Sequence, residues 1–165
     1  MTGTGASLSR RLAALAYEAL LVAALFLVVG FLTVPLSPAP GTVPSLRVPD
    51  LPARVLSFAL VFAAAAVYFG WSWTAHRRTL AMKTWRIALV RADGGPLTRK
   101  IALARYFSAW IGPVVALAAY LALRPSGLGA LALPVLALNF LWALFDPDRL
   151  FLHDRIAGTR IVDRE

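Results

Sequence analysis

Four long apolar blocks separated by short polar segments dominate the pattern of this chain. The blocks cover residues 12–34, 55–75, 101–123 and 128–145. A helix rises about 1.5 Å per residue and the hydrocarbon core of a bilayer is about 30 Å thick, so even the shortest block nearly spans a membrane. The pattern predicts an all-α membrane protein. We expect a four-helix transmembrane bundle that forms a single domain over residues 1–165.

The composition agrees with this class. Hydrophobic residues make up 59% of the chain, charged residues 15%, and the mean hydropathy is +0.71. A soluble domain carries about 25% charged residues. Arg10 and Arg11 precede the first block as in a secretory signal peptide, but the block is much longer than the apolar core of about 7–15 residues in such peptides. We therefore expect it to be retained as a span. The chain has no cysteine, which excludes disulfides and thiolate sites.

The basic residues indicate the orientation of the spans. The net charge is +9, and arginine and lysine concentrate before the first block, between residues 76 and 100, and after the fourth block. The proline-rich loop between the first two blocks holds only Arg47 and Arg54, and the turn between the last two holds only Arg124. The positive-inside rule then places both termini and residues 76–100 in the cytoplasm. We expect the basic excess to contact anionic lipid headgroups and no nucleic acid.

Two short segments outside the blocks have β-strand character. Trp85–Arg91 alternates polar and apolar residues, and the tail has another short β-compatible run at 158–163. Neither is stable alone, so we expect them to pair as a small cytoplasmic two-stranded β element. Thr98 is placed to cap the third span, and Thr79–Arg86 is predicted to form a short interfacial helix.

Glu18 is the only ionisable residue in the first block. A carboxylate at that depth costs a few kcal/mol on insertion scales, so it normally has a partner or a task. Arg11 shares its helix face but lies about 10 Å away along the axis. We therefore expect Arg105, about one turn into the third block, to be the partner of Glu18. Two roles stay open: a buried ion pair that holds the helices together, and a protonatable carboxylate on an ion path.

A second polar group follows the fourth block. We expect a salt-bridge network that attaches the tail to the cytoplasmic rim, with Asp154 paired to Arg11 or Arg78. His153 has the chemistry of a metal ligand or proton acceptor, but the other histidine, His76, is distant in sequence, so we expect no metal site. The predicted rim network consists of Asp146, His153, Asp154 and Arg78.

Three motifs together resemble the RDD family of bacterial membrane proteins. They are Arg11–Glu18, the segment Thr79–Gly95, and Leu152–Thr159 with its His-Asp and Gly-Thr pairs. The family has an arginine followed seven residues later by an aspartate, where this chain has Glu18; the glycines that commonly flank the middle motif are also missing here. The resemblance implies a multi-pass protein of the bacterial cytoplasmic (inner) membrane. Cation/proton antiport is proposed for some members.

These observations lead to two functional hypotheses. The first is a small ion- or proton-coupled transporter with Glu18 as the intramembrane carboxylate. The alternative is a non-catalytic membrane module that organises or assists a partner membrane protein or lipid. We find no nucleophile–base pair and no cofactor motif. We therefore expect that the protein is not an enzyme, has no catalytic residue and binds no cofactor. Four short spans enclose little volume, which favours a homo-oligomer or a membrane-protein partner.

Overall fold

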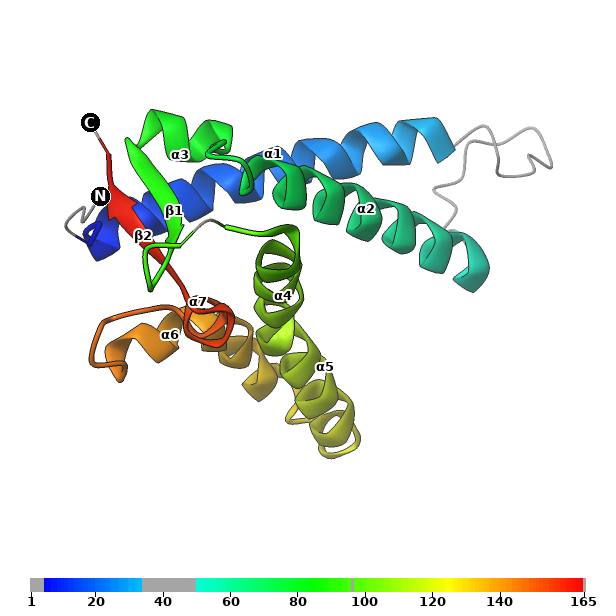
Figure 1. The fold of residues 1–165 in the computed structure, drawn as a ribbon. Helices are drawn as coiled ribbons and strands as arrows, with labels where there is room; N and C mark the ends of the chain where they lie inside the picture. Colours follow the sequence, from blue (N-terminus) through cyan, green and yellow to red (C-terminus); the bar gives the residue numbers. More distant parts are fainter. Residues whose placement is uncertain (1–4, 34–49, 96, 165) are drawn as a thin grey trace.

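The first two helices form an antiparallel pair. The computed structural model describes residues 5–33, 50–95 and 97–164; the proline-rich loop predicted after the first span lies outside these residues. Helix α1 is Leu8–Thr33 and α2 is Leu51–Ser72, and they lie side by side in Figure 1. Helix α2 begins before the predicted residue 55 because the Asp50 side chain accepts a hydrogen bond from the Ala53 N–H at 2.9 Å.

The third predicted span is a helix with a break. Helix α4 covers Arg99–Ala109 and α5 covers Ile111–Leu123, with the interruption at Trp110. Proline has no backbone N–H, so Pro113 cannot donate to the carbonyl of Ala109 four residues earlier. The helix is thus interrupted just before this proline. The structure also confirms the N-cap on α4: the Ile101 N–H donates to the Thr98 hydroxyl at 3.4 Å.

The fourth predicted span, 128–145, is not a continuous α-helix. After α5 the chain turns through η2 (Arg124–Ser126) and Gly127, whose φ of 72° suits glycine. It then returns along α5 in short helical pieces, with Pro134 inside the first of them. These are the 3₁₀-helix η3 (Gly129–Ala137), α6 (Leu138–Leu141) and the 3₁₀-helix η4 (Trp142–Leu144). Among the described residues, three helices are long and apolar enough to cross a membrane, at Leu8–Leu32, Leu51–Ser72 and Arg99–Ser126, and the returning segment is shorter.

The predicted β element is present. Strands β1 (Ile87–Arg91) and β2 (Thr159–Asp163) pair antiparallel, with Ile87 opposite Asp163 and Arg91 opposite Thr159. The helix predicted at Thr79–Arg86 is present as α3 (Leu80–Thr84), while its interfacial position stays a prediction. Helix α7 (Leu152–Ala157) precedes β2.

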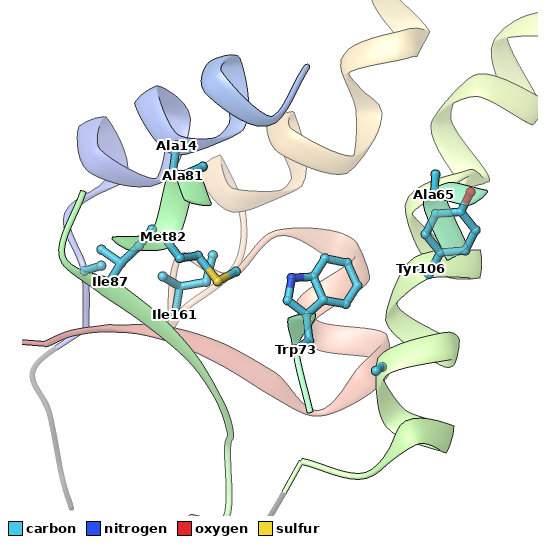
Figure 2. Packing of buried hydrophobic residues seen from close by; sticks show 10 residues of the cluster. Ala14, Ala65, Trp73, Ala81, Met82, Ile87, Tyr106 and Ile161 are labelled. Carbon is cyan, nitrogen blue, oxygen red and sulfur yellow. The ribbon is translucent and has the colours of Figure 1, made fainter. Parts of the chain in front are cut away.

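Two helical pairs diverge from a shared base. In Figure 1 the α1–α2 pair extends to one side and the α4–α5 arm, with the returning segment beside it, extends to another. The four-helix transmembrane bundle expected from the sequence therefore stays a prediction, while the helical class and the small sheet are confirmed. At the base, small and aromatic side chains from α1, α2, α3, α4 and both strands form the core (Figure 2). The core includes Ala14, Ala65, Trp73, Ala81, Met82, Ile87, Tyr106 and Ile161. Most other apolar side chains of α1 are exposed, as expected for a helix surrounded by lipid.

Candidate functional site: an intramembrane carboxylate and a buried arginine network

Glu18 is held by a hydroxyl group. The Thr79 hydroxyl donates a hydrogen bond to Oε1 of Glu18 at 2.6 Å, and its oxygen accepts from the Met82 N–H at 3.1 Å. Thr79 is the N-cap of α3, so the same side chain both starts this helix and positions the carboxylate. Among the described residues Glu18 forms no ion pair. The predicted Glu18–Arg105 pair is therefore wrong.

Arg105 pairs with Asp154 instead. Its Nε donates to Oδ1 of Asp154 at 2.7 Å, and the guanidinium carbon lies 4.3 Å from the centre of the Trp73 ring. The Thr159 hydroxyl donates to the same carboxylate oxygen at 2.8 Å. Asp154 has no exposed surface and Arg105 is 6% exposed. The alternatives predicted for Asp154, Arg11 and Arg78, are also wrong, because α7 and β2 bring Asp154 against α4.

His153 completes this buried group. Its Nε2 lies 3.2 Å from an Arg105 nitrogen. A guanidinium only donates, so Nε2 accepts and the ring proton is assigned to Nδ1, which has no hydrogen-bond partner among the described residues. Burial, together with the Arg105 charge, lowers the pKa of His153 to about 4. The group is therefore a neutral histidine beside an ionised arginine–aspartate pair.

The charge of Asp154 is stabilised by its partners. Burial alone would raise the pKa of Asp154, but Arg105, His153 and the Thr159 hydrogen bond outweigh it and keep the pKa below its usual value. The second oxygen, Oδ2, is buried without a hydrogen-bond partner among the described residues. We infer that Asp154 is ionised at neutral pH and that its charge depends on Arg105.

The other predicted rim residues lie apart from this group. Asp146 stabilises the turn after η4, where its side chain accepts hydrogen bonds from the N–H groups of Asp148 at 2.9 Å and Leu150 at 3.2 Å. Arg155 lies 3.4 Å from it. Burial opposes ionisation, but these N–H groups and Arg155 hold the pKa of Asp146 below its usual value. Arg78 forms no ion pair with a described residue, so it is not part of the network.

Arg11 is also buried, at 6% exposed, although it contacts neither Glu18 nor Asp154 through a hydrogen bond. Its terminal nitrogen donates to the carbonyl of Arg149 at 2.8 Å, and its guanidinium carbon lies 5.0 Å from the Phe151 ring centre. Its Nε has no hydrogen-bond partner among the described residues. Arg11 thus connects the start of α1 to the segment before α7.

Glu18, Arg11, Arg105 and His153 all border one cavity of about 570 Å³. Its walls come from α1, α2, the α4–α5 break and α6, so it occupies the space between the two helical pairs. We call it the apolar cavity, because most of its walls are hydrocarbon. Its lining includes Ala14, Val22, Phe69, Trp110, Pro113 and Phe140. An apolar space with a few polar groups on its wall is the usual character of a small-molecule or ion site.

Sequence reasoning missed three members of the site. Thr79 is expected only at the start of a helix and Thr159 only in a strand, and Trp73 has no predicted role in the site. Trp71 is 62% exposed, but Trp73 is 4% exposed and stacks on Phe69 at 4.7 Å. The position of Thr79 in front of a predicted helix could have identified it, because an N-cap threonine directs its hydroxyl to the first N–H groups of the helix and is thereby fixed in place.

The described residues contain no group of three His, Cys, Asp or Glu side chains that could hold a metal ion. No curated protein and no solved structure matches the chain significantly. The family model of the RDD family matches residues 5–158, which includes the first two motifs, the third up to Gly158, and every site residue named above except Thr159. The chain therefore belongs to the RDD family.

Proposed function

We propose that the protein is a small ion- or proton-coupled membrane transporter in which Glu18 carries the proton. The observation that carries this proposal is the environment of Glu18. Its carboxylate borders a cavity of about 570 Å³ and receives one hydrogen bond, from the Thr79 hydroxyl, without an ion pair among the described residues. An ionisable group within a span is normally expensive and marks a substrate or ion path.

The alternative role of Glu18, as a buried ionic anchor, has lost its main support. Arg105 is already satisfied by Asp154 and Trp73. The anchor between elements is thus the Arg105–Asp154 pair, which joins α4 to α7. Glu18 can gain or lose a proton without breaking an ion pair, as a proton carrier requires.

The arrangement of the chain ends supports the proposed topology. The Ala6 N–H donates to the Ile161 carbonyl at 3.1 Å, so the start of α1 and the last strand lie together. A return across the membrane is then needed after three spans. A 3₁₀-helix rises about 2.0 Å per residue, which allows the pieces from Gly129 to Leu144 to reach roughly 30 Å. We therefore propose a multi-pass protein of the bacterial inner membrane, with both termini, the sheet and α7 in the cytoplasm.

The proposal also includes an assembly, because the pathway must continue beyond the apolar cavity. The two helical pairs diverge, so a second copy or a partner membrane protein would cover the outer wall of this cavity (Figure 1). The proposed activity involves no catalytic residue and no cofactor. The competing hypothesis remains a non-catalytic module that assists a partner protein or lipid.

Ion flux in proteoliposomes tests the proposal. Wild type, Glu18→Gln and the control Asp50→Asn are reconstituted with a pH-sensitive dye inside, and Na⁺, K⁺ or Li⁺ is added outside in separate experiments. Asp50 is an exposed cap at the other end of α2, outside the apolar cavity. We expect cation-dependent proton movement in wild type and Asp50→Asn. In Glu18→Gln it should fall by about a hundredfold or more, in the range that general acid–base groups contribute.

Two results would contradict the proposal. Equal proton movement in wild type and Glu18→Gln would remove the proton-carrier role of Glu18. No movement in wild type with any of the three cations would reject transport of these ions and favour the non-catalytic module.

A further inference from the structure

A second cavity, of about 750 Å³, lies at the start of α1. It is bounded by residues 5–8, by the segment Pro147–Leu150 and by β2, and four arginines border it. We call it the basic cavity. Its arginines are Arg11, Arg149, Arg155 and Arg160. Glu18 does not border it, and of the charged or titratable residues at the apolar cavity only Arg11 also borders the basic cavity.

Only one of these arginines is neutralised. Arg155 donates to Asp148 at 2.8 Å and lies 3.4 Å from Asp146. Asp148 is also the one acidic residue among the described residues that line the basic cavity. Among the described residues, Arg11, Arg149 and Arg160 form no ion pair. Three of the four arginines at the basic cavity therefore lack an ion-paired carboxylate among these residues, although Asp154 attracts Arg11 electrostatically from beyond salt-bridge distance.

Two of these side chains are partly unsatisfied. Arg11 is 6% exposed, and its Nε has no hydrogen-bond partner among the described residues. Nε of Arg160 is also buried and also has no such partner. Arg11 cannot turn away, because the Arg149 carbonyl and the Phe151 ring hold its guanidinium. A buried cation without a paired carboxylate is costly, so such a group indicates an anion that is bound in the working protein.

The end of α1 adds to this positive potential. Ser7 and Leu8 border the basic cavity, and the first turn of α1 contains no acidic residue. The first N–H groups of a helix lack intrahelical partners, and the helix dipole places partial positive charge there. In a helix of 26 residues this end is a common place for phosphate groups.

We propose that the basic cavity binds a phosphate group. Arginine forks match the tetrahedral oxygens of phosphate, which can accept hydrogen bonds from several guanidinium groups at once. A cavity of about 750 Å³ has room for a phosphorylated headgroup as well as for inorganic phosphate. Leu8 is the first residue of the candidate membrane span in α1, so the basic cavity lies at the N-terminal end of that span. An anionic phospholipid and a free phosphate compound share this chemistry, and the experiment distinguishes them.

The test uses the full-length protein with Arg149→Gln/Arg160→Gln, which leaves the buried Arg11 intact. Lys100→Gln is the matched control, because Lys100 is an exposed cation outside the basic cavity. Two probes are titrated: inorganic phosphate against protein in detergent, and phosphatidylglycerol against protein in phosphatidylcholine nanodiscs. Binding is followed by the shift in unfolding temperature and by native mass spectrometry. Size-exclusion chromatography verifies that each variant is folded.

We expect wild type and Lys100→Gln to bind at least one probe equally well. Binding should be at least about tenfold weaker in the double variant, because two guanidinium groups that can donate charge-assisted hydrogen bonds to the phosphate are lost. Saturation by phosphatidylglycerol alone identifies a lipid headgroup as the ligand. Displacement of that lipid by inorganic phosphate identifies a site for free phosphate compounds. Equal binding by wild type and the double variant, or no binding of either probe to wild type, would overturn the proposal. The outcome is independent of ion flux, since Glu18 is unchanged in every variant.

Discussion

The side-chain amide of Asn139 donates a hydrogen bond to the backbone carbonyl of Ala109 at 2.7 Å. This is the carbonyl that Pro113 leaves without a helical donor. Asn139 is 1% exposed and lies on α6, so a side chain from the returning segment repairs the break between α4 and α5. The proline that interrupts the third span thus also creates the site where the fourth segment attaches.

A double-mutant cycle tests this relationship. Asn139→Leu should cost about 1–3 kcal/mol, because it leaves the Ala109 carbonyl buried without a donor. In the Pro113→Ala background the new backbone N–H can serve that carbonyl, so the same substitution should cost clearly less. The measurement is chemical unfolding in detergent. Costs that add within about 0.5 kcal/mol would show that the two residues act independently.

Gly112 allows this close contact between α5 and the returning segment. A Cβ atom at Gly112 would lie 3.0 Å from the Leu136 carbonyl oxygen and 3.3 Å from Nδ2 of Asn139. Gly112→Ala should therefore destabilise the protein by about 1–3 kcal/mol, because a backbone atom has to move.

Gly70→Ala is the matched control for Gly112→Ala. At Gly70 in α2 the nearest atom to a new Cβ is Cδ2 of Leu103, at 4.0 Å, which is an ordinary contact. This substitution should stabilise the protein by about 0.5–1 kcal/mol, since alanine favours a helix over glycine. Unfolding temperatures measured together should move in opposite directions, and a decrease of equal size in both variants would contradict the role of close packing at Gly112.

The pattern of apolar residues was sufficient to predict the first three spans and the pairing of β1 with β2. It failed for the returning segment, because hydrophobic content is similar in an α-helix and in a chain of 3₁₀ turns. Pro134 within the block and its shortness favour an irregular segment, but they do not determine its form. The divergence of the two helical pairs depends on the packing of α3, α7 and the sheet at their base, and no periodicity within one span encodes it.

The candidate site shows a similar limit. The sequence allowed a prediction of how deep each residue lies in the membrane, and it predicted a similar depth for Glu18 and Arg105. The direction in which each side chain points depends on helix neighbours. In the structure α3 places Thr79 against Glu18, and α7 brings Asp154 to Arg105. Glu18, Arg105 and Asp154 thus each have a partner other than the predicted one, and Arg78 pairs with no described residue.

Loss of the Arg105–Asp154 pair should be one of the most damaging changes in the chain. Asp154→Asn leaves Arg105 buried without a counter-charge, and breaking a buried pair in this way costs about 3–5 kcal/mol. The control is Asp163→Asn, which removes a half-exposed pair with Arg10 and should cost about 0–1 kcal/mol. Unfolding in detergent measures both. A cost for Asp154→Asn no larger than that of the control would show that the buried pair does not hold α4 and α7 together.

The neutral state of His153 predicts a pH-dependent stability. Its pKa in the folded protein is about 4, below the ordinary 6.5 of the unfolded chain. Between these values the unfolded state binds a proton that the folded state does not, so stability is complete above pH 6.5 and falls as the pH decreases towards 4. The full loss corresponds to about 3 kcal/mol. Below pH 4 protonation of Asp154 should weaken the protein further, since its pKa is also lowered in the folded state.

The variant His153→Gln tests this prediction. Its side chain can still accept the Arg105 hydrogen bond but does not titrate, so its unfolding temperature should change much less than that of wild type between pH 7 and pH 4.5. Parallel curves for the two proteins would show that another group causes the acid sensitivity.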